Sequence, residues 1–233
     1  MCACEAVRVG RAGRISFGLA VAIVLVLVLA QLLLPPIAAQ RVRARVGKYG
    51  TVESVSVKAW PAVKLLWGSA DSVTVRAKRL QMSPQQAAKL LWEARGVERM
   101  TTAAASVREG SLQLHDARFQ KHGNALQAQA WAARRDVQAA LGKGFEVQLL
   151  SSGGGQVKVR VSGGLFGVGA SVDAVARAQE GKLVVHPLGF LLGSLQLTLF
   201  ANSHVRVEGV GASAAVGPGG VAGYELTMRA SLR

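Results

Sequence analysis

The chain of 233 residues is poor in cysteine, in aromatic side chains and in acidic side chains. Its only cysteines are Cys2 and Cys4, so disulfide bonds cannot stabilise the rest of the chain. Aromatic residues make up 5% of the sequence, which leaves few rings to fill a core. Only 13 aspartates and glutamates oppose 28 lysines and arginines, giving a formal net charge of +15. A protein this basic is expected to attract anionic partners.

Motifs for catalysis and for metal binding are also missing. The sequence has no HExxH, no GxSxG and no Walker-type phosphate loop, and its GGLFGVGASV segment lacks the third glycine of a dinucleotide fingerprint. The carboxylates are scattered rather than paired, and the four histidines do not follow metal-ligand spacing: His115, His122, His186 and His204. We therefore expect no catalytic residue, no metal and no cofactor, and we do not expect an enzyme.

One uninterrupted apolar stretch runs from Ile15 to Leu34, and the lack of a second one excludes a polytopic membrane protein. A helix needs about 20 such residues to cross the hydrocarbon layer of a bilayer. Pro35 and Pro36 follow, and they predict the end of the helix because proline does not continue a helix interior. The sequence predicts a transmembrane helix or signal anchor at residues 15–34. The alternative is a signal peptide cleaved after the weak small-residue site at residues 37–39.

Basic residues flank this apolar stretch on both sides, so charge alone does not orient it. A large domain behind a first hydrophobic segment is usually translocated, and both cysteines lie before the segment. We predict a single-pass protein of the cell membrane, with residues 1–14 in the cytoplasm and a domain of residues 40–233 outside. Residues 1–39 hold three arginines and one glutamate, so the outer part keeps +13 of the +15 charges. Acidic phospholipids and wall polymers are its expected partners, and nucleic acid is not.

Small aliphatic and polar residues alternate with period two through most of the outer domain. Examples are VSVKA at residues 55–59, VTVRA at 73–77 and LTMRASL at 226–232. This pattern predicts half-buried antiparallel strands, about ten in all. Short helices are predicted at residues 61–67, 84–95 and 134–141. The second of these carries a capping box and an N-terminal proline in its first residues, SPQQ.

The balance of strands and helices predicts the fold class. Two or three short helices cannot cover the apolar faces of so many strands. We expect a mainly β protein of the α+β class, built on a strongly curved antiparallel sheet behind one N-terminal transmembrane helix. The sheet could close on its own side chains, which periodicity alone favours, or it could curl around a groove that takes an apolar ligand.

The segment WPAVKLLW at residues 60–67 is the most unusual local feature. Tryptophan and lysine beside leucine suit a membrane interface, where amphipathic side chains lie among the headgroups. The alternative is that these residues plug one end of the sheet. Basic residues further along could meet phosphate groups or simply form a solvated strand face. The candidate lipid or membrane contacts are Trp60, Lys64, Leu65, Leu66, Trp67, Arg76, Lys78 and Arg79.

The order of these segments resembles the LmeA-like family of actinobacterial cell-envelope phospholipid-binding proteins. Three stretches carry the resemblance: VESVSVKAWPAVKLLWGSADSVTVRAKRL at residues 52–80, ALQAQAWAARRDVQAALGKGFEVQLL at 125–150 and KLVVHPLG at 182–189. The resemblance implies an extracytoplasmic fold of lipid-carrier type that binds acidic phospholipids and serves the maturation of envelope glycolipids or polymers. The resemblance favours a sheet that curls around a ligand-binding groove over a sheet that closes on its own side chains.

Two functions are therefore in competition. The first is a membrane-tethered protein that binds an anionic phospholipid or envelope glycolipid in an apolar groove and supports the maturation of an envelope glycolipid or polymer. The alternative is an envelope scaffold or assembly factor with a filled core, which binds anionic wall polymers or a protein partner. An enzyme acting on envelope glycoconjugates is a weaker third possibility, because no catalytic motif supports it.

Overall fold

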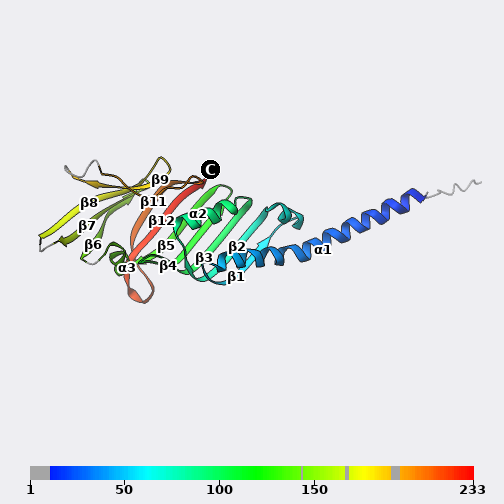
Figure 1. Ribbon diagram of the computed structural model, residues 1–233, viewed down its shortest axis with the longest axis horizontal. Helices are drawn as coiled ribbons and strands as arrows, with labels where there is room; N and C mark the ends of the chain where they lie inside the picture. The colour runs from blue at the N-terminus through cyan, green and yellow to red at the C-terminus, as the bar shows by residue number, and fades with distance from the viewer. Residues whose placement is uncertain (1–10, 143, 166–167, 190–194) are drawn as a thin grey trace, which may run out of the picture.

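The computed structural model describes residues 11–142, 144–165, 168–189 and 195–233, without the side chains of residues 11–22 and of those flanking the gap at 166–167. A long N-terminal helix leads into a domain made mainly of strands (Figure 1). In chain order the elements are α1 (Arg11–Gly47), β1 (Gly50–Lys58), the 3₁₀ helix η1 (Ala62–Trp67), β2 (Ala70–Gln81), α2 (Pro84–Glu93), β3 (Val97–Glu109), β4 (Leu112–His122), β5 (Ala125–Ala133), α3 (Arg134–Leu141), β6 (Phe145–Gly153), β7 (Gln156–Leu165), β8 (Val168–Gln179), β9 (Lys182–Leu188), β10 (Leu197–Phe200), β11 (Val205–Val216), the 3₁₀ turn η2 (Pro218–Gly220) and β12 (Ala222–Leu232).

The predicted mainly β class is confirmed, but the strands form two open sheets. The large sheet has the order β1-β2-β3-β4-β5-β12-β11, and the small sheet has the order β10-β9-β8-β7-β6. One pair departs from the expected antiparallel arrangement, since β2 and β3 run parallel. The reason is α2, which forms a crossover between them, as a parallel pair requires. Ser83 and Gln86 cap α2 reciprocally, as the sequence predicted.

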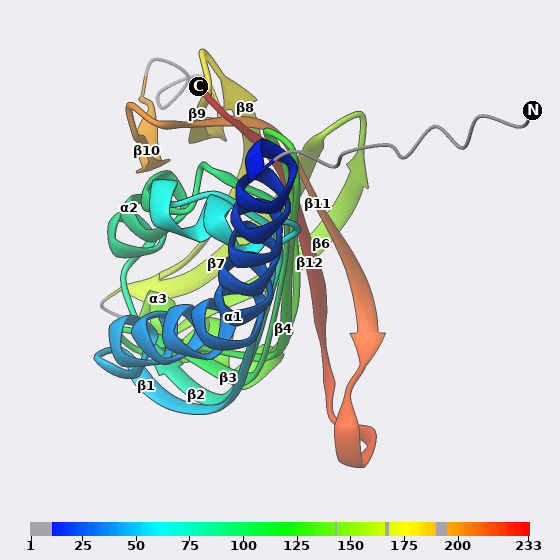
Figure 2. The same ribbon diagram turned by 90° about the vertical axis from the view of Figure 1, so that its right-hand side faces the viewer.

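Helix α1 does not end at Leu34. It continues through Pro35 and Pro36 to Gly47, and it changes direction along its length (Figure 2). Each proline removes one backbone hydrogen bond, which explains the bend and makes the continuation unfavourable by itself. Packing offsets this cost: the last turns of α1 lie on a cluster of buried valines. The helix side chains in this contact are Ala38, Ala39, Val42 and Val46.

The buried residues define two faces of the large sheet. The inner face carries the core side chains, among them Val75, Leu126 and Val207, each less than 4% exposed. Helices α1 and α2 cover parts of this face, and the small sheet packs near β11. The outer face carries the polar residues that alternate with them. Among the residues that the structure describes, one charged side chain is buried: Lys121 Nζ donates to the carbonyl oxygens of Arg95 (3.3 Å) and Val97, just after α2, and burial lowers its pKa.

The small sheet is joined to the large one through the edge strand β11. The backbone N–H groups of Val207 and Val210 donate to the carbonyl oxygens of Gly181 (2.9 Å) and Gly155 (3.0 Å), which lie in the β8–β9 and β6–β7 turns. Two turns of the small sheet therefore cover the unpaired edge of the large one. The small sheet lies at the end of the domain away from the free part of α1 (Figure 1).

We predict that a side chain at Gly209 destabilises the contact between β11 and the β6–β7 turn. A Cβ at Gly209 would lie 3.2 Å from the Cα of Gly155, whereas a Cβ at Gly153 would meet nothing within 4 Å. Gly209→Val should lower the free energy of unfolding by about 1–3 kcal/mol, because the added methyl groups push against backbone. Thermal unfolding checks this, with Gly153→Val as the matched control. Equal unfolding temperatures of the two variants would contradict a close contact between the sheets.

Candidate lipid and membrane contact site

The η1 turn displays apolar side chains to solvent. Trp60, Leu66 and Trp67 are exposed by 72%, 69% and 76%. Lys64 is also exposed, whereas Leu65 is half buried and packs on the valine cluster under α1. Four of the five predicted turn residues therefore point outward, and Leu65 fastens the turn to the core.

A glutamine from α1 holds the turn on one side. The Nε2 of Gln31 donates to the carbonyl oxygen of Ala59 (3.1 Å), and its Oε1 accepts from the N–H of Ala62 (2.8 Å). Gln31 is the single glutamine inside the apolar stretch of residues 15–34. Its side chain takes the place of a missing backbone partner at the start of η1, since the Ala62 N–H has no partner within its own helix.

An aspartate from β2 holds the turn on the other side. The backbone N–H of Trp60 donates to Oδ2 of Asp71 (2.6 Å), and Lys64 Nζ lies 3.4 Å from Oδ1 of the same carboxylate. The Trp60 hydrogen bond, followed by Lys64 and Arg99, lowers the pKa of Asp71 below its usual 3.8. The turn is thus held in place from both sides while its tryptophans remain free.

The free part of α1 and the η1 turn lie next to each other. Most of the apolar side chains between Ile23 and Leu33 are exposed, by 43–67%. Within Ile23–Gly47 the most apolar stretch of 18 residues has a mean hydropathy of 2.2, so this part of α1 is apolar enough and long enough to cross a membrane. The η1 turn lies at the end of the domain from which α1 projects (Figure 1), and Gln31 connects the two. Together they form one exposed apolar surface.

The predicted basic residues do not join this surface. Arg76, Lys78 and Arg79 are exposed on the far half of β2, about 20–30 Å along the strand from its start at Ala70. Other basic residues are nearer to the turn. Lys58 and Arg99 both pair with Ser72 in the register, beside the Asp71 that contacts η1. Sequence reasoning could not place Arg99 because its proximity depends on strand pairing, whereas Lys58 is only two residues before Trp60 and was overlooked.

A second apolar surface lies along the inner face of the large sheet and continues onto the small sheet. Phe119, Met228 and Val210 on the large sheet, and Ala178 and Leu183 on the small one, pack only partly buried around the same cluster. Further half-exposed apolar residues follow at period two, namely Ala128, Ala130 and Leu226 on the large sheet and Val159, Val161 and Val172 on the small one. The apolar face that neither helix covers was expected from the ratio of strands to helices.

The β9–β10 segment extends this apolar surface to the rim of the small sheet. Leu195, Leu197 and Leu199 are 52–60% exposed. No lysine, arginine, aspartate or glutamate occurs between Lys182 and Arg206. In a chain with a net charge of +15, such a long uncharged segment points to an apolar contact. Its alternation of leucine with polar residues was visible in the sequence, but its exposure was not.

Ionisable residues do not form a metal site in the described part of the chain, where no three His, Cys, Asp or Glu side chains gather. His115 Nε2 lies 3.2 Å from Asp136 Oδ2, which links β4 to α3, and Arg135 Nε lies 3.8 Å from Oδ1 of the same carboxylate.

A family model described as LmeA-like phospholipid-binding matches residues 26–208. The chain belongs to this family. The match covers most of the sequence, from within α1 to the start of β11, and includes the η1 turn and the small sheet. Comparisons with curated proteins and with solved structures give no match. The resemblance read from the sequence is confirmed, and membership of the LmeA-like phospholipid-binding family supports lipid as the ligand class of the apolar surfaces.

We predict that Gln31→Leu loosens the η1 turn without changing the apolar character of α1. The substitution removes both hydrogen bonds and leaves the N–H of the buried Ala62 without a partner, a cost of about 1–3 kcal/mol. Hydrogen exchange at Ala62 in the full chain should become roughly tenfold faster or more. Gln40→Leu, an exposed position on the same helix, is the matched control. Equal exchange in both variants would show that Gln31 does not hold the turn.

We also predict how the turn responds to acid. Because the folded-state pKa of Asp71 lies below 3.8, this carboxylate stabilises the turn at neutral and mildly acidic pH, and the stabilisation is lost as the pH falls through that depressed pKa. The exchange protection of the Trp60 amide, corrected for intrinsic rates, should stay constant from about pH 7 to about pH 5 and fall below about pH 4. In Asp71→Asn this acid step should be absent. A loss of protection already at mildly acidic pH would contradict the assignment.

Proposed function

We propose that this chain is a membrane-tethered extracytoplasmic protein that holds an anionic phospholipid or a related envelope glycolipid. The lipid tails lie against the half-exposed apolar faces of the two sheets, and the protein serves the maturation of an envelope glycolipid or polymer. The observation that carries this proposal is the apolar inner face, which α1, α2 and the small sheet leave partly uncovered. Family membership supports the ligand class.

Burial of the tails supplies the binding energy. Each buried methylene contributes about 0.8 kcal/mol, and each square ångström of apolar surface about 25 cal/mol. Two acyl chains therefore bind without any covalent step, and no catalytic group is required. The lining is mostly Val, Ala and Leu, whose small side chains leave room above the sheet for a flexible tail.

The tether orients the domain on the membrane surface. If α1 crosses the bilayer from Ile15, the 16 residues before Gln31 span about 24 Å, close to the thickness of the hydrocarbon core. Gln31 and the η1 turn then lie at the interface, where Trp60 and Trp67 rest among the headgroups. Lys58, Lys64 and Arg99 beside the turn attract anionic headgroups. The N-terminus is cytoplasmic in this arrangement, and the sheets lie outside.

We expect the two exposed tryptophans to contact lipid. In nanodiscs that contain the full chain and a phospholipid brominated on its acyl chains, tryptophan fluorescence should be quenched, because bromine quenches only at short range. The quenching should largely disappear in the double variant Trp60→Phe/Trp67→Phe. It should persist in Trp92→Phe/Trp131→Phe, since Trp92 stacks on His204, Trp131 packs near His115, and both rings are half buried away from η1. Quenching that survives the first double variant would show that η1 does not dock.

A second experiment separates lipid holding from membrane docking alone. A phosphatidylglycerol with a photoreactive diazirine at the end of one tail is incorporated into membranes that carry the full chain. We expect cross-links on β4, β5 and β12, near Phe119, Ala128 and Met228, besides those on α1. Cross-links confined to α1 and η1 would overturn the lipid-holding proposal. They would favour a scaffold whose basic surface binds wall polymers or a protein partner.

A further inference from the structure

The outer face of the large sheet carries a regular grid of polar side chains opposite the apolar inner face. The strand register places Arg118, Gln129, Thr227 and Gly211 in one row across β4, β5, β12 and β11. The next row holds Gln120, Gln127, Arg229 and Gly209. All six polar side chains are exposed, and the two glycines leave the β11 end of each row without a side chain.

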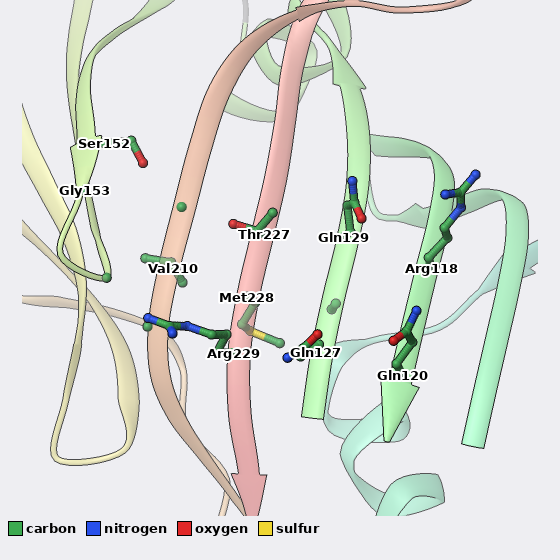
Figure 3. Close-up of a pocket in the computed structure, with 14 residues that line it drawn as sticks. Arg118, Gln120, Gln127, Gln129, Ser152, Gly153, Val210, Thr227, Met228 and Arg229 are labelled. Atoms are coloured by element: carbon green, nitrogen blue, oxygen red, sulfur yellow. The ribbon is translucent and has the colours of Figure 1, made fainter. Parts of the chain in front are cut away.

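These residues line a hollow of about 420 Å³. The β6–β7 turn forms its wall through Ser152, Gly153 and Gly155, and the strands form its floor (Figure 3). The two arginines lie at opposite margins, with the glutamine side chains between them (Figure 3). The lining contains no carboxylate and no aromatic ring. Among the ion pairs formed by the described residues, none involves Arg118 or Arg229.

One corner of the hollow concentrates groups that bind phosphate. A Cβ at Gly211 would lie 2.6 Å from Thr227 Oγ1 and 3.7 Å from Ser152 Oγ, so both hydroxyl groups surround the glycine. A Cβ at the neighbouring Gly209 would lie 3.6 Å from Nη2 of Arg229. Because Gly209 and Gly211 have no side chains, the guanidinium of Arg229 and the hydroxyl groups of Thr227 and Ser152 have room beside them. A guanidinium with flanking hydroxyl groups recognises the oxygens of a phosphate.

We propose that this hollow binds a polyol phosphate. Arg229, Thr227 and Ser152 hold the phosphate, and the amides of Gln127 and Gln120 hydrogen-bond the hydroxyl groups of the polyol, while Nε2 of Gln129 donates to Oε1 of Glu225. Side-chain amides suit hydroxyl groups because each amide donates hydrogen bonds through its nitrogen and accepts them through its oxygen. The absence of carboxylates from the lining disfavours a cation, and the absence of rings disfavours a nucleobase, which would be stacked. The six polar side chains point to the side of the sheet opposite the apolar lipid surface, so the proposal does not depend on lipid holding.

Glucose 6-phosphate is the soluble probe, titrated into the full chain in phosphatidylcholine nanodiscs and followed by calorimetry. We expect it to bind more tightly than inorganic phosphate or glucose, because only the joined molecule uses both parts of the hollow. Arg229→Gln should weaken binding at least tenfold, since a charge-assisted hydrogen bond contributes about 1.5–3 kcal/mol. Arg177→Gln on the small sheet removes the same charge and should leave binding unchanged. Thr227→Val, of nearly equal shape, should weaken it less than Arg229→Gln.

Phosphatidylglycerol nanodiscs distinguish the source of the ligand. If they compete with glucose 6-phosphate, and Arg229→Gln abolishes the competition, the ligand is a lipid headgroup. If they do not compete while Arg229→Gln still weakens sugar phosphate binding, the ligand is a soluble or polymer-borne polyol phosphate. Equal affinities in Arg229→Gln and Arg177→Gln, with both variants folded by thermal unfolding, would overturn the proposal. So would a glucose 6-phosphate affinity no higher than that of inorganic phosphate.

Discussion

The packing of the last turns of α1 on the inner face of β1, β2 and β3 is the contact on which the rest of the molecule depends. Together with Leu65 of η1 and Ala94 after α2, it buries the valine cluster at one end of the large sheet. It also brings Gln31 within hydrogen-bonding distance of the η1 turn. Without the continuation through Pro35 and Pro36, the apolar helix would be a separate tether. With it, packing and the Gln31 hydrogen bonds fix the helix to the sheet and to the η1 turn.

The contact between β11 and the turns of the small sheet has the corresponding role at the other end of the large sheet. A seven-stranded sheet with an open edge presents unpaired backbone groups, which invite pairing with other chains. Here two turns of the small sheet supply the partners, so the edge is covered while the small sheet stays free to extend the apolar inner face. The same contact places the β6–β7 turn beside the polar grid on the outer face. The contact between β11 and the small sheet therefore helps to form both the apolar inner surface and the polar hollow on the outer face.

The strands, the three short helices and the uncovered apolar face could be predicted because each leaves a local pattern in the sequence. The division into two sheets could not, since β5 pairs with β12 across almost a hundred residues and no local pattern records this. Arg76, Lys78 and Arg79 were grouped with the η1 turn because they are near in sequence, yet a strand carries them away from it, and Lys58 and Arg99 take their place. Gln31 was a visible signal, because a single glutamine in a long apolar run requires a polar partner.

The scarcity of aromatic residues connects composition to function. Large rings would fill the space above the inner face and close the core, whereas valine and alanine cover a sheet thinly. The inner face stays half exposed along β4, β5 and β12, where Phe119, Ala128 and Met228 are only partly buried. Two of the four tryptophans are on η1 instead, outside the core, with more than two thirds of their surface exposed. Such a distribution weakens the folded core and leaves apolar area available on its surface. A protein gains from this arrangement only when another apolar molecule, such as a lipid tail, supplies the missing contacts.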